Sequence, residues 1–265
     1  MSALLEIDDL RIEFRLATGT VVAADGVSFA VEAGETLAVV GESGSGKTAT
    51  ALSVLRLNPE PPCVYAGGEV RLDGRDVLRL PEKELRRIRG NDVAMVFQDP
   101  MTSLNPVKRV GAQVAEVLRR HQGATRARAR AAAVEALREA GIPDPERRAG
   151  QYPHQLSGGL RQRVMIAMAL VGRPRVLIAD EPTTALDVTV QARILDLLVG
   201  LQRKHGMAIV LITHDLGVVA EVADRVVVLR SGQVVETGDV VPVFEQPQED
   251  YTRELLRATP KLERV

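Results

Sequence analysis

Residues 39–48 read Val39-Val40-Gly41-Glu42-Ser43-Gly44-Ser45-Gly46-Lys47-Thr48, which fits the phosphate-binding pattern G-x-x-x-x-G-K-[ST]. An apolar run over 36–40 predicts a buried strand before this pattern, and 49–56 predicts a helix after it. Phosphate at such a strand–loop–helix junction meets backbone N–H groups and the positive end of the helix dipole. Lys47 adds a charge near the β- and γ-phosphates, and Thr48 offers a hydroxyl to Mg²⁺. The stretch therefore predicts a nucleotide-phosphate site in an α/β fold.

The composition narrows the class of protein. The 265 residues carry 34 basic and 35 acidic side chains, so the net charge of −1 gives no general attraction to nucleic acid. Aromatic residues make up only 3% of the chain, so the core must be mostly aliphatic, which fits buried parallel strands. No apolar run approaches the ~18–20 residues that span a bilayer, and the acidic N-terminus is no signal peptide, so we expect a cytosolic chain. Cys63, the single cysteine, argues against a cysteine-built zinc site and is expected to be a loop thiol without a role.

The N-terminal third alternates between short apolar runs and turns. Residues 4–7, 11–15 and 26–31 are predicted to be antiparallel strands with a hairpin. Phe14 ends one of these runs, and spacing alone favours neither a base-covering role nor a core position. A further strand is predicted over 67–74, ending in an Asp-Gly turn.

Polar side chains follow several later apolar runs. Gln98 comes directly after the predicted strand 93–97, where it could orient Mg²⁺ or water or simply cap a loop. The apolar run from Arg175 ends in Asp180 and Glu181, whose side chains must project differently because strand residues alternate. We assign Asp180 to the Mg²⁺ shell and Glu181 to polarising the attacking water. His214 follows the strand 207–213 and is expected to contact the γ-phosphate or the water.

The stretch from about 107 to 172 is predicted to be helical, with helices over 110–120 and 124–140. The arginines at 126, 128 and 130 alternate with alanine without aromatics, which favours a solvated helix face over a nucleic-acid site. Ser157, Gly158 and Gly159 then open a helix, either as a second anion-binding helix start or as a simple cap. Asp187 is predicted to cap the helix that follows it, and a hairpin over 225–236 and a helix over 250–258 complete the chain.

Taken together, these motifs resemble the nucleotide-binding subunit of ABC transporters over nearly the whole chain. Six elements stand in the family's order: the phosphate loop 41–48, Gln98, the signature Leu156–Leu160, the strand ending in Asp180-Glu181, the loop 185–187 and His214. The resemblance implies a P-loop ABC core with an N-terminal antiparallel β subdomain and an inserted helical subdomain. It implies a catalytic core over 1–98 and 173–246, a helical signature subdomain over about 99–172, and a C-terminal tail over 247–265.

The resemblance also implies ATP and Mg²⁺ as cofactors and a head-to-tail dimer in which each ATP lies between two subunits. The residues implied to bind ATP within one subunit are Phe14, which would stack on adenine, and Gly41, Glu42, Ser43, Gly44, Ser45, Gly46, Lys47, Thr48, Gln98, Asp180, Glu181 and His214. Those implied to reach the partner's ATP are Leu156, Ser157, Gly158, Gly159 and Asp187. Within these sets, catalysis is expected from Glu181, His214, Gln98 and Lys47, and metal binding from Thr48, Gln98 and Asp180.

Within the family, the stretches 97–106, 161–170, 181–191, 214–219 and 247–256 are similar to the bacterial oligopeptide, dipeptide and nickel importers. That similarity implies a peripheral protein on the cytoplasmic side of the bacterial plasma membrane. Its implied partners are a second ATPase subunit, identical or paralogous, two membrane permeases docking near 99–107, and an extracytoplasmic solute-binding protein. Two features depart from the pattern: Leu160 stands where the general signature ends in Gln, and the cysteine-rich iron–sulfur tail of many relatives does not follow.

Two other classes of function also use a phosphate loop: non-transport ABC ATPases and small-molecule P-loop kinases. A non-transport ABC ATPase, acting in DNA repair, chromosome architecture or translation, would predict a coiled-coil insertion, zinc cysteines or a second ATPase half, and this sequence has none of them. A small-molecule P-loop kinase would not need the Ser157–Gly159 helix start or His214. An importer ATPase for di- or oligopeptides is therefore the leading hypothesis, with nickel or another solute as the alternative cargo.

Overall fold

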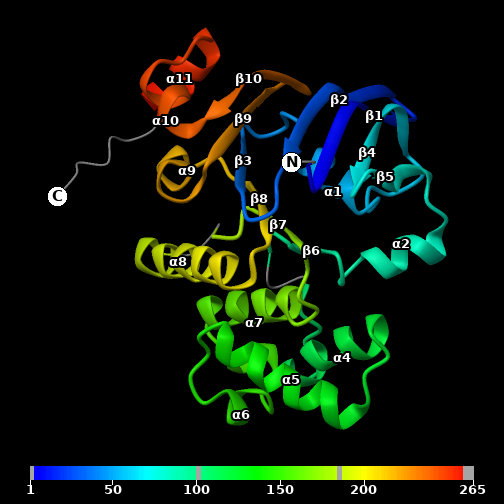
Figure 1. Cartoon of the computed structure of the whole chain (residues 1–265), viewed down its shortest axis with the longest axis vertical. Coiled ribbons are helices and arrows are strands. Elements are labelled where there is room, and N and C mark those ends of the chain that lie inside the picture. Colours follow the sequence, from blue (N-terminus) through cyan, green and yellow to red (C-terminus); the bar gives the residue numbers. More distant parts are fainter. Residues whose placement is uncertain (1–2, 100–102, 184–186, 259–265) are drawn as a thin grey trace. The chain divides into compact units, whose positions relative to one another are not determined.

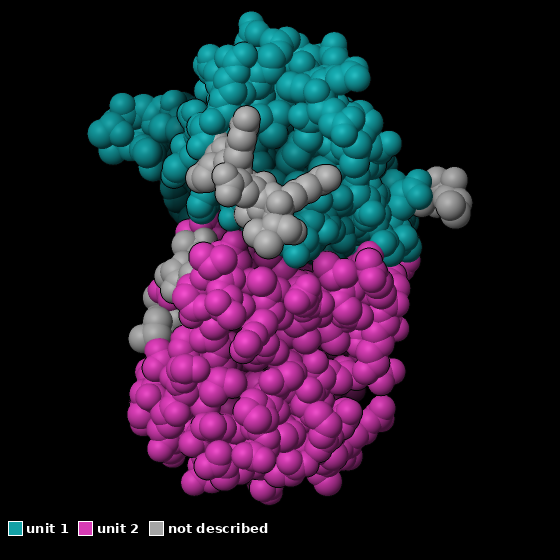
Figure 2. Space-filling model, turned by 90° about the vertical axis from the view of Figure 1, so that its left-hand side faces the viewer, with its two compact units in different colours: residues 1–81, 208–265 teal, residues 82–207 magenta. Residues whose placement is uncertain are grey.

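The structure, a computed structural model, describes residues 3–99, 103–183 and 187–258. The chain folds into two compact units, Met1–Pro81 with Ala208–Val265, and Glu82–Met207 (Figure 2). The sequence-predicted boundaries of a helical subdomain, about 99–172, remain a prediction.

The first unit contains a mainly parallel sheet around β3 (Thr36–Val40). This strand lies between β8 (Ala208–Ile212) and β9 (Arg225–Arg230), parallel to both, and β10 (Gln233–Asp239) pairs antiparallel with β9 (Figure 1). Every residue of β3 and of β8 is buried. Burial on both faces explains why these strands read as continuous apolar runs. The predicted strand 36–40 and the predicted hairpin over 225–236 are confirmed.

The same unit carries an antiparallel sheet in the order β2 (Gly19–Val31), β1 (Leu5–Leu16), β4 (Cys63–Leu72) and β5 (Arg75–Asp76). The hairpin between β1 and β2 confirms the antiparallel prediction. The division of β1 into two strands, 4–7 and 11–15, was wrong, because the chain continues through a β-bulge at Asp8 and Asp9. At this bulge Gly68 lets β4 approach closely, since a Cβ there would lie 2.3 Å from the Asp9 carbonyl oxygen.

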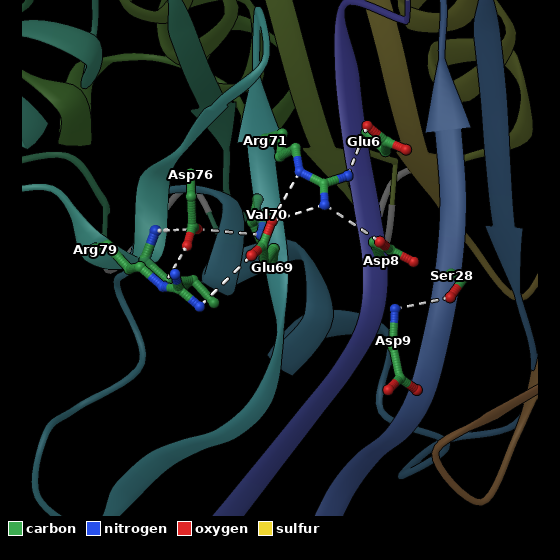
Figure 3. Close-up of polar contacts among 10 residues, drawn as sticks. Glu6, Asp8, Asp9, Ser28, Glu69, Val70, Arg71, Asp76 and Arg79 are labelled. Carbon is green, nitrogen blue, oxygen red and sulfur yellow. Dashed lines mark hydrogen bonds and ion pairs between the residues drawn. The ribbon is translucent and has the colours of Figure 1, made fainter.

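Charged side chains surround the bulge, and Arg71 forms ion pairs with three of the carboxylates (Figure 3). The guanidinium of Arg71 lies 3.1 Å from a Glu6 carboxylate oxygen, 3.3 Å from Asp8 and 2.7 Å from Glu69. The displaced backbone N–H of Asp9 donates to the Ser28 hydroxyl at 2.8 Å. The backbone N–H that the bulge removes from the ladder therefore finds its partner within the same sheet.

Cys63 corrects a second expectation from the sequence. It begins β4, opposite Phe14 of β1, rather than lying in a loop, and is only 4% exposed. Burial raises the pKa of its thiol. The strand starts earlier than predicted because pairing with β1 extends it toward the prolines.

The helices of the first unit are α1 (Lys47–Val54), η1 (Val77–Arg79), α9 (Leu216–Val222), α10 (Val240–Glu245) and α11 (Asp250–Ala258). Figure 1 draws α10 and α11 beside β10. An apolar cluster joins α9, α10 and α11 to β3 and β9 through Val40, Val219, Val228, Val243 and Tyr251. The bounds of α11 are those predicted from the sequence.

The second unit has a parallel strand pair, β6 (Val93–Val96) and β7 (Val176–Asp180), and most of the helices. These helices are α2 (Glu82–Ile88), α4 (Val110–His121), α5 (Arg126–Glu139), α6 (Pro145–Arg148), η2 (Pro153–Gln155), α7 (Gly158–Leu170) and α8 (Val188–His205). Helices α4, α5 and α7 pack against one another around Val114, Leu137 and Ile166, all fully buried. The arginines at 126, 128 and 130 are exposed on α5, as predicted. Within the described ranges of both units, each helix is too short or too polar to cross a bilayer.

Candidate nucleotide-binding site

The phosphate loop follows β3 and is held by backbone contacts on two sides. A Cβ on Gly41 would lie 2.1 Å from the Leu229 carbonyl oxygen of β9, and one on Gly46 would lie 2.0 Å from the Ala23 carbonyl oxygen of β2. Gly46 also has a φ of 100°, which favours glycine. The glycines of the pattern therefore serve close backbone approach as well as turn geometry.

The polar groups of the loop suit a phosphate chain. Lys47 is 7% exposed, and its ammonium donates to the carbonyl oxygens of Gly41 and Glu42, each at 2.7 Å. The hydroxyl oxygens of Ser45 and Thr50 are buried without a hydrogen-bond partner. No side chain caps the first turn of α1, because Gly46 occupies the N-cap position. A buried cation, an orphaned buried hydroxyl and an uncapped helix start are what an anion at this place would use.

His214 lies at the same edge of the sheet as this loop. In the parallel pair of β3 and β8, Val39 is the register partner of Ile212. Gly41 lies two residues after Val39, and His214 lies two residues after Ile212. His214 is exposed, and Asp215 beside it caps α9 by accepting from the Gly217 N–H at 2.9 Å. The prediction that His214 stands at the carboxyl end of its strand is confirmed, whereas its contact with phosphate or water stays a prediction.

In the second unit the structure brings Gln98 and Glu181 together. The Gln98 amide donates to a Glu181 carboxylate oxygen at 2.8 Å. Asp180, one residue earlier, is only 4% exposed at the end of β7, and the separate roles of the two carboxylates stay a prediction. Glu181 has a φ of 45°, a left-handed backbone that is uncommon for a residue with a side chain and is often found at functional sites.

The predicted metal ligands offer a hydroxyl on Thr48, an amide oxygen on Gln98 and a carboxylate on Asp180. Oxygen donors of this kind fit Mg²⁺. Thr48 belongs to the first unit and the other two to the second, so each set is placed only within its own unit. The assignment of these residues to Mg²⁺ remains a prediction.

The signature stretch begins α7 beside a hollow of about 460 Å³. Ser157 occupies the N-cap position but its side chain makes no capping hydrogen bond, while Leu156 is buried. Asp187 caps α8 as predicted, accepting from the Val190 N–H at 2.9 Å. The described residues that line the hollow are Ser157, Gly158, Gly159, Leu160, Arg163, Asp187, Val190 and Arg193.

Two arginines of this hollow were not singled out from the sequence. Burial lowers the pKa of the Arg163 guanidinium, and the positive charge of Arg193 lowers it further. The hollow therefore combines an uncapped helix start with two cations and one carboxylate, that of Asp187, so its net positive charge favours an anion. No spacing in the sequence pairs these residues, because they come from α7 and α8 and meet only through packing.

Phe14 is half-buried in β1, where its register partners are Val21 of β2 and Cys63 of β4. It lies near the end of the hairpin, beside the exposed Leu16 and Val21. Its side chain is thus neither a fully buried core residue nor fully exposed, and the adenine-stacking role stays a prediction.

Comparison with known proteins agrees with these observations. Residues 24–184 match the family model described as "ABC transporter". The chain is 53% identical over 263 residues to the oligopeptide transport ATP-binding protein OppD of Bacillus subtilis, covering 99% of this chain and 74% of that protein. It is 55% identical over 258 residues to the peptidoglycan transport ATP-binding protein YejF of Agrobacterium fabrum, where the match spans 97% of this chain but only 47% of the relative.

A solved structure shares the fold. The dimeric post-hydrolysis state of the ATP-binding cassette MJ0796, bound to ADP and Pi, has a TM-score of 0.78 and 30% sequence identity, covering 89% of this chain and 98% of that one. This likeness confirms the predicted α/β fold of the P-loop ABC type. The family match, the curated relatives and the fold all agree with the loop that surrounds Lys47, and the chain belongs to the ABC transporter family as an ATP-binding and ATP-hydrolysing subunit.

Proposed function

We propose that this chain is the ATPase subunit of a bacterial importer for di- or oligopeptides, acting at the cytoplasmic face of the plasma membrane. The assignment of peptides as the cargo rests on the 53% identity, over 99% of the chain, to a protein named for oligopeptide transport. In this proposal hydrolysis drives import through separate permease subunits, supplied with peptide by an extracytoplasmic binding protein.

The proposed hydrolysis assigns one task to each polar group. Lys47 and the backbone N–H groups of the phosphate loop hold the β- and γ-phosphates. Thr48, Gln98 and Asp180 would hold Mg²⁺, which would supply positive charge beside the phosphates. Glu181 takes up a proton from the attacking water, and the 2.8 Å hydrogen bond from the Gln98 amide supports this by orienting the carboxylate. His214 holds the γ-phosphate or the water.

The second ATPase subunit is proposed to complete each site with its Ser157–Gly159 helix start. The dimeric structure of MJ0796 supports this arrangement by analogy. The hollow at that helix start, with Arg163 and Arg193 in its wall, supports an anionic partner group.

Permease docking is proposed near 99–107, of which 100–102 lie outside the described residues. A hollow of about 440 Å³ lies nearby in the second unit, and its lining is mostly apolar. The residues that form it include Met95, Phe97, Ser103, Val117, Met165 and Met168. Phe97 is 40% exposed, and an exposed aromatic beside methionines suits an apolar ridge of a partner helix.

The test uses the full transporter, assembled with the permeases and binding protein encoded with this chain. Glu181→Gln should bind ATP with about wild-type affinity and lose at least about a hundredfold in hydrolysis, since a positioned base contributes roughly that much. Glu221→Gln, an exposed glutamate on α9, is the matched control and should hydrolyse ATP normally. An ATP hydrolysis rate near that of wild type in Glu181→Gln would refute the role of Glu181 as the base.

Cargo is tested on the same complex. Peptide-loaded binding protein should stimulate ATP hydrolysis and drive uptake of labelled peptide into vesicles. Stimulation by nickel and not by peptide would refute the peptide assignment while leaving the ATPase intact.

A further inference from the structure

The C-terminal helix α11 touches the phosphate loop through Tyr251. The backbone N–H of Glu42 donates to the Tyr251 hydroxyl oxygen at 3.2 Å, across 209 positions of sequence. Tyr251 is only 5% exposed, and its ring packs in the apolar cluster with Val40 and Val228. The Arg230 guanidinium lies over the ring at 4.6 Å from its centroid. The ring is therefore held by the apolar cluster and by Arg230, and its hydroxyl contacts the loop.

The same peptide plane carries the contact to Lys47. The peptide between Gly41 and Glu42 contributes two groups: its N–H donates to Tyr251, and its carbonyl, that of Gly41, accepts from the Lys47 ammonium at 2.7 Å. A peptide unit is planar, so fixing its N–H fixes the direction of its carbonyl. Tyr251 thus orients the carbonyl against which the lysine ammonium rests.

The start of α11 is anchored independently of the phosphate loop. The Glu236 carboxylate of β10 accepts from the backbone N–H groups of Gln248 at 2.8 Å and Glu249 at 3.2 Å. Arg253 donates to the Gln248 carbonyl at 2.7 Å. These contacts fix the segment that places Tyr251. The position of Tyr251 therefore does not depend on the phosphate loop, and Tyr251 can restrain the loop.

We propose that Tyr251 is a positioning residue for nucleotide binding, because it fixes the peptide plane that holds the Lys47 ammonium in place. The inference rests on the ATP binding of this family and not on the peptide cargo. It gives the C-terminal helix a direct part in the ATP site, in addition to its packing on the sheet.

The test compares Tyr251→Phe with wild type. Phenylalanine keeps the ring in the cluster and under Arg230 but cannot accept the Glu42 N–H. Loss of one such hydrogen bond should raise the Kd for ATP and the KM by about three- to tenfold. The kcat at saturating ATP should change less than about twofold, and the thermal midpoint without nucleotide should fall by about 2–4 °C, the cost of one hydrogen bond in a chain of this size.

Thr252→Val is the matched control. The Thr252 hydroxyl lies on the same helix and is buried without a hydrogen-bond partner, so its removal alters the helix without touching the loop. Its Kd for ATP should equal that of wild type. A Kd for Tyr251→Phe within twofold of wild type, or an equal rise in Thr252→Val, would overturn the proposal. Failure of wild-type protein to bind ATP would instead refute the ATPase function itself.

Discussion

Gly44 and Gly46, two of the three glycines with positive φ angles in the phosphate loop, have different surroundings. Gly46 has a φ of 100°, and a Cβ there would lie 2.0 Å from the Ala23 carbonyl oxygen of β2. Gly44 has a φ of 82°, and a Cβ there would meet nothing within 4 Å. Substituting each by alanine therefore separates the cost of backbone strain from the cost of a collision.

The magnitudes follow from these distances. Gly44→Ala should cost only the backbone strain of a positive φ, about 1–2 kcal/mol. Gly46→Ala should cost that strain and also the displacement of β2 or of the loop, for which overpacking is worth about 1–3 kcal/mol. The expected difference between the two variants is thus about 2 kcal/mol. For a chain of this size it corresponds to a gap of about 4–8 °C in thermal midpoint.

The measurement is thermal unfolding without nucleotide, followed by far-UV circular dichroism because the chain has no tryptophan. Leaving out nucleotide keeps any loss of ATP binding from entering the comparison. Equal midpoints for the two variants would refute the claim that the Ala23 carbonyl of β2 leaves no room for a Cβ at Gly46.

Two further predictions concern stability. Burial raises the pKa of Tyr65 to about 12, so the folded state favours the neutral phenol, and stability should hold below pH 10 and fall as the pH rises toward 12. Urea unfolding at pH 9 and 11 should show a smaller alkaline loss in Tyr65→Phe, and equal losses would contradict the shift. Asp187→Ala should cost about 1 kcal/mol by removing the cap of α8, or about 2–4 °C of thermal midpoint, whereas Asp187→Asn should retain the cap and the midpoint. Equal midpoints for the two Asp187 variants would show that the cap contributes nothing.

Elements with a local cause were predictable from the sequence. The strand over 36–40 is a continuous apolar run because both of its faces are buried, and that pattern is visible without knowing its neighbours. The helix over 250–258 begins just after a proline-containing turn and has an amphipathic pattern, so its bounds could also be predicted. In each case the information lies within about ten residues.

The bulge in β1 shows where local information ends. Asp8 and Asp9 look like a turn between two strands, yet β1 continues because Gly68 and Arg71 of β4 accommodate the extra residue. These partners lie some sixty residues further along the chain. The same holds for Tyr251, whose hydrogen bond to Glu42 depends on how α11 packs and has no counterpart in the spacing of the sequence.

Strand register explains which predicted site residues meet. In the parallel pair of β6 and β7, Val96 is the partner of Ala179, so Gln98 and Glu181 each follow two residues beyond a register pair. Equal offsets at the carboxyl ends of neighbouring parallel strands bring side chains together, and the amide and the carboxylate do form a hydrogen bond at 2.8 Å. The sequence could place both residues at strand ends, but it could not supply the adjacency of β6 and β7 or their register. A one-residue slip of β6 against β7 would turn the alternate side chains of β6 to the opposite face of the sheet. The buried residues Val96 and Ala179 fix the register against such a slip. Their packing, more than any property of Gln98 itself, therefore determines that the Gln98 amide faces Glu181.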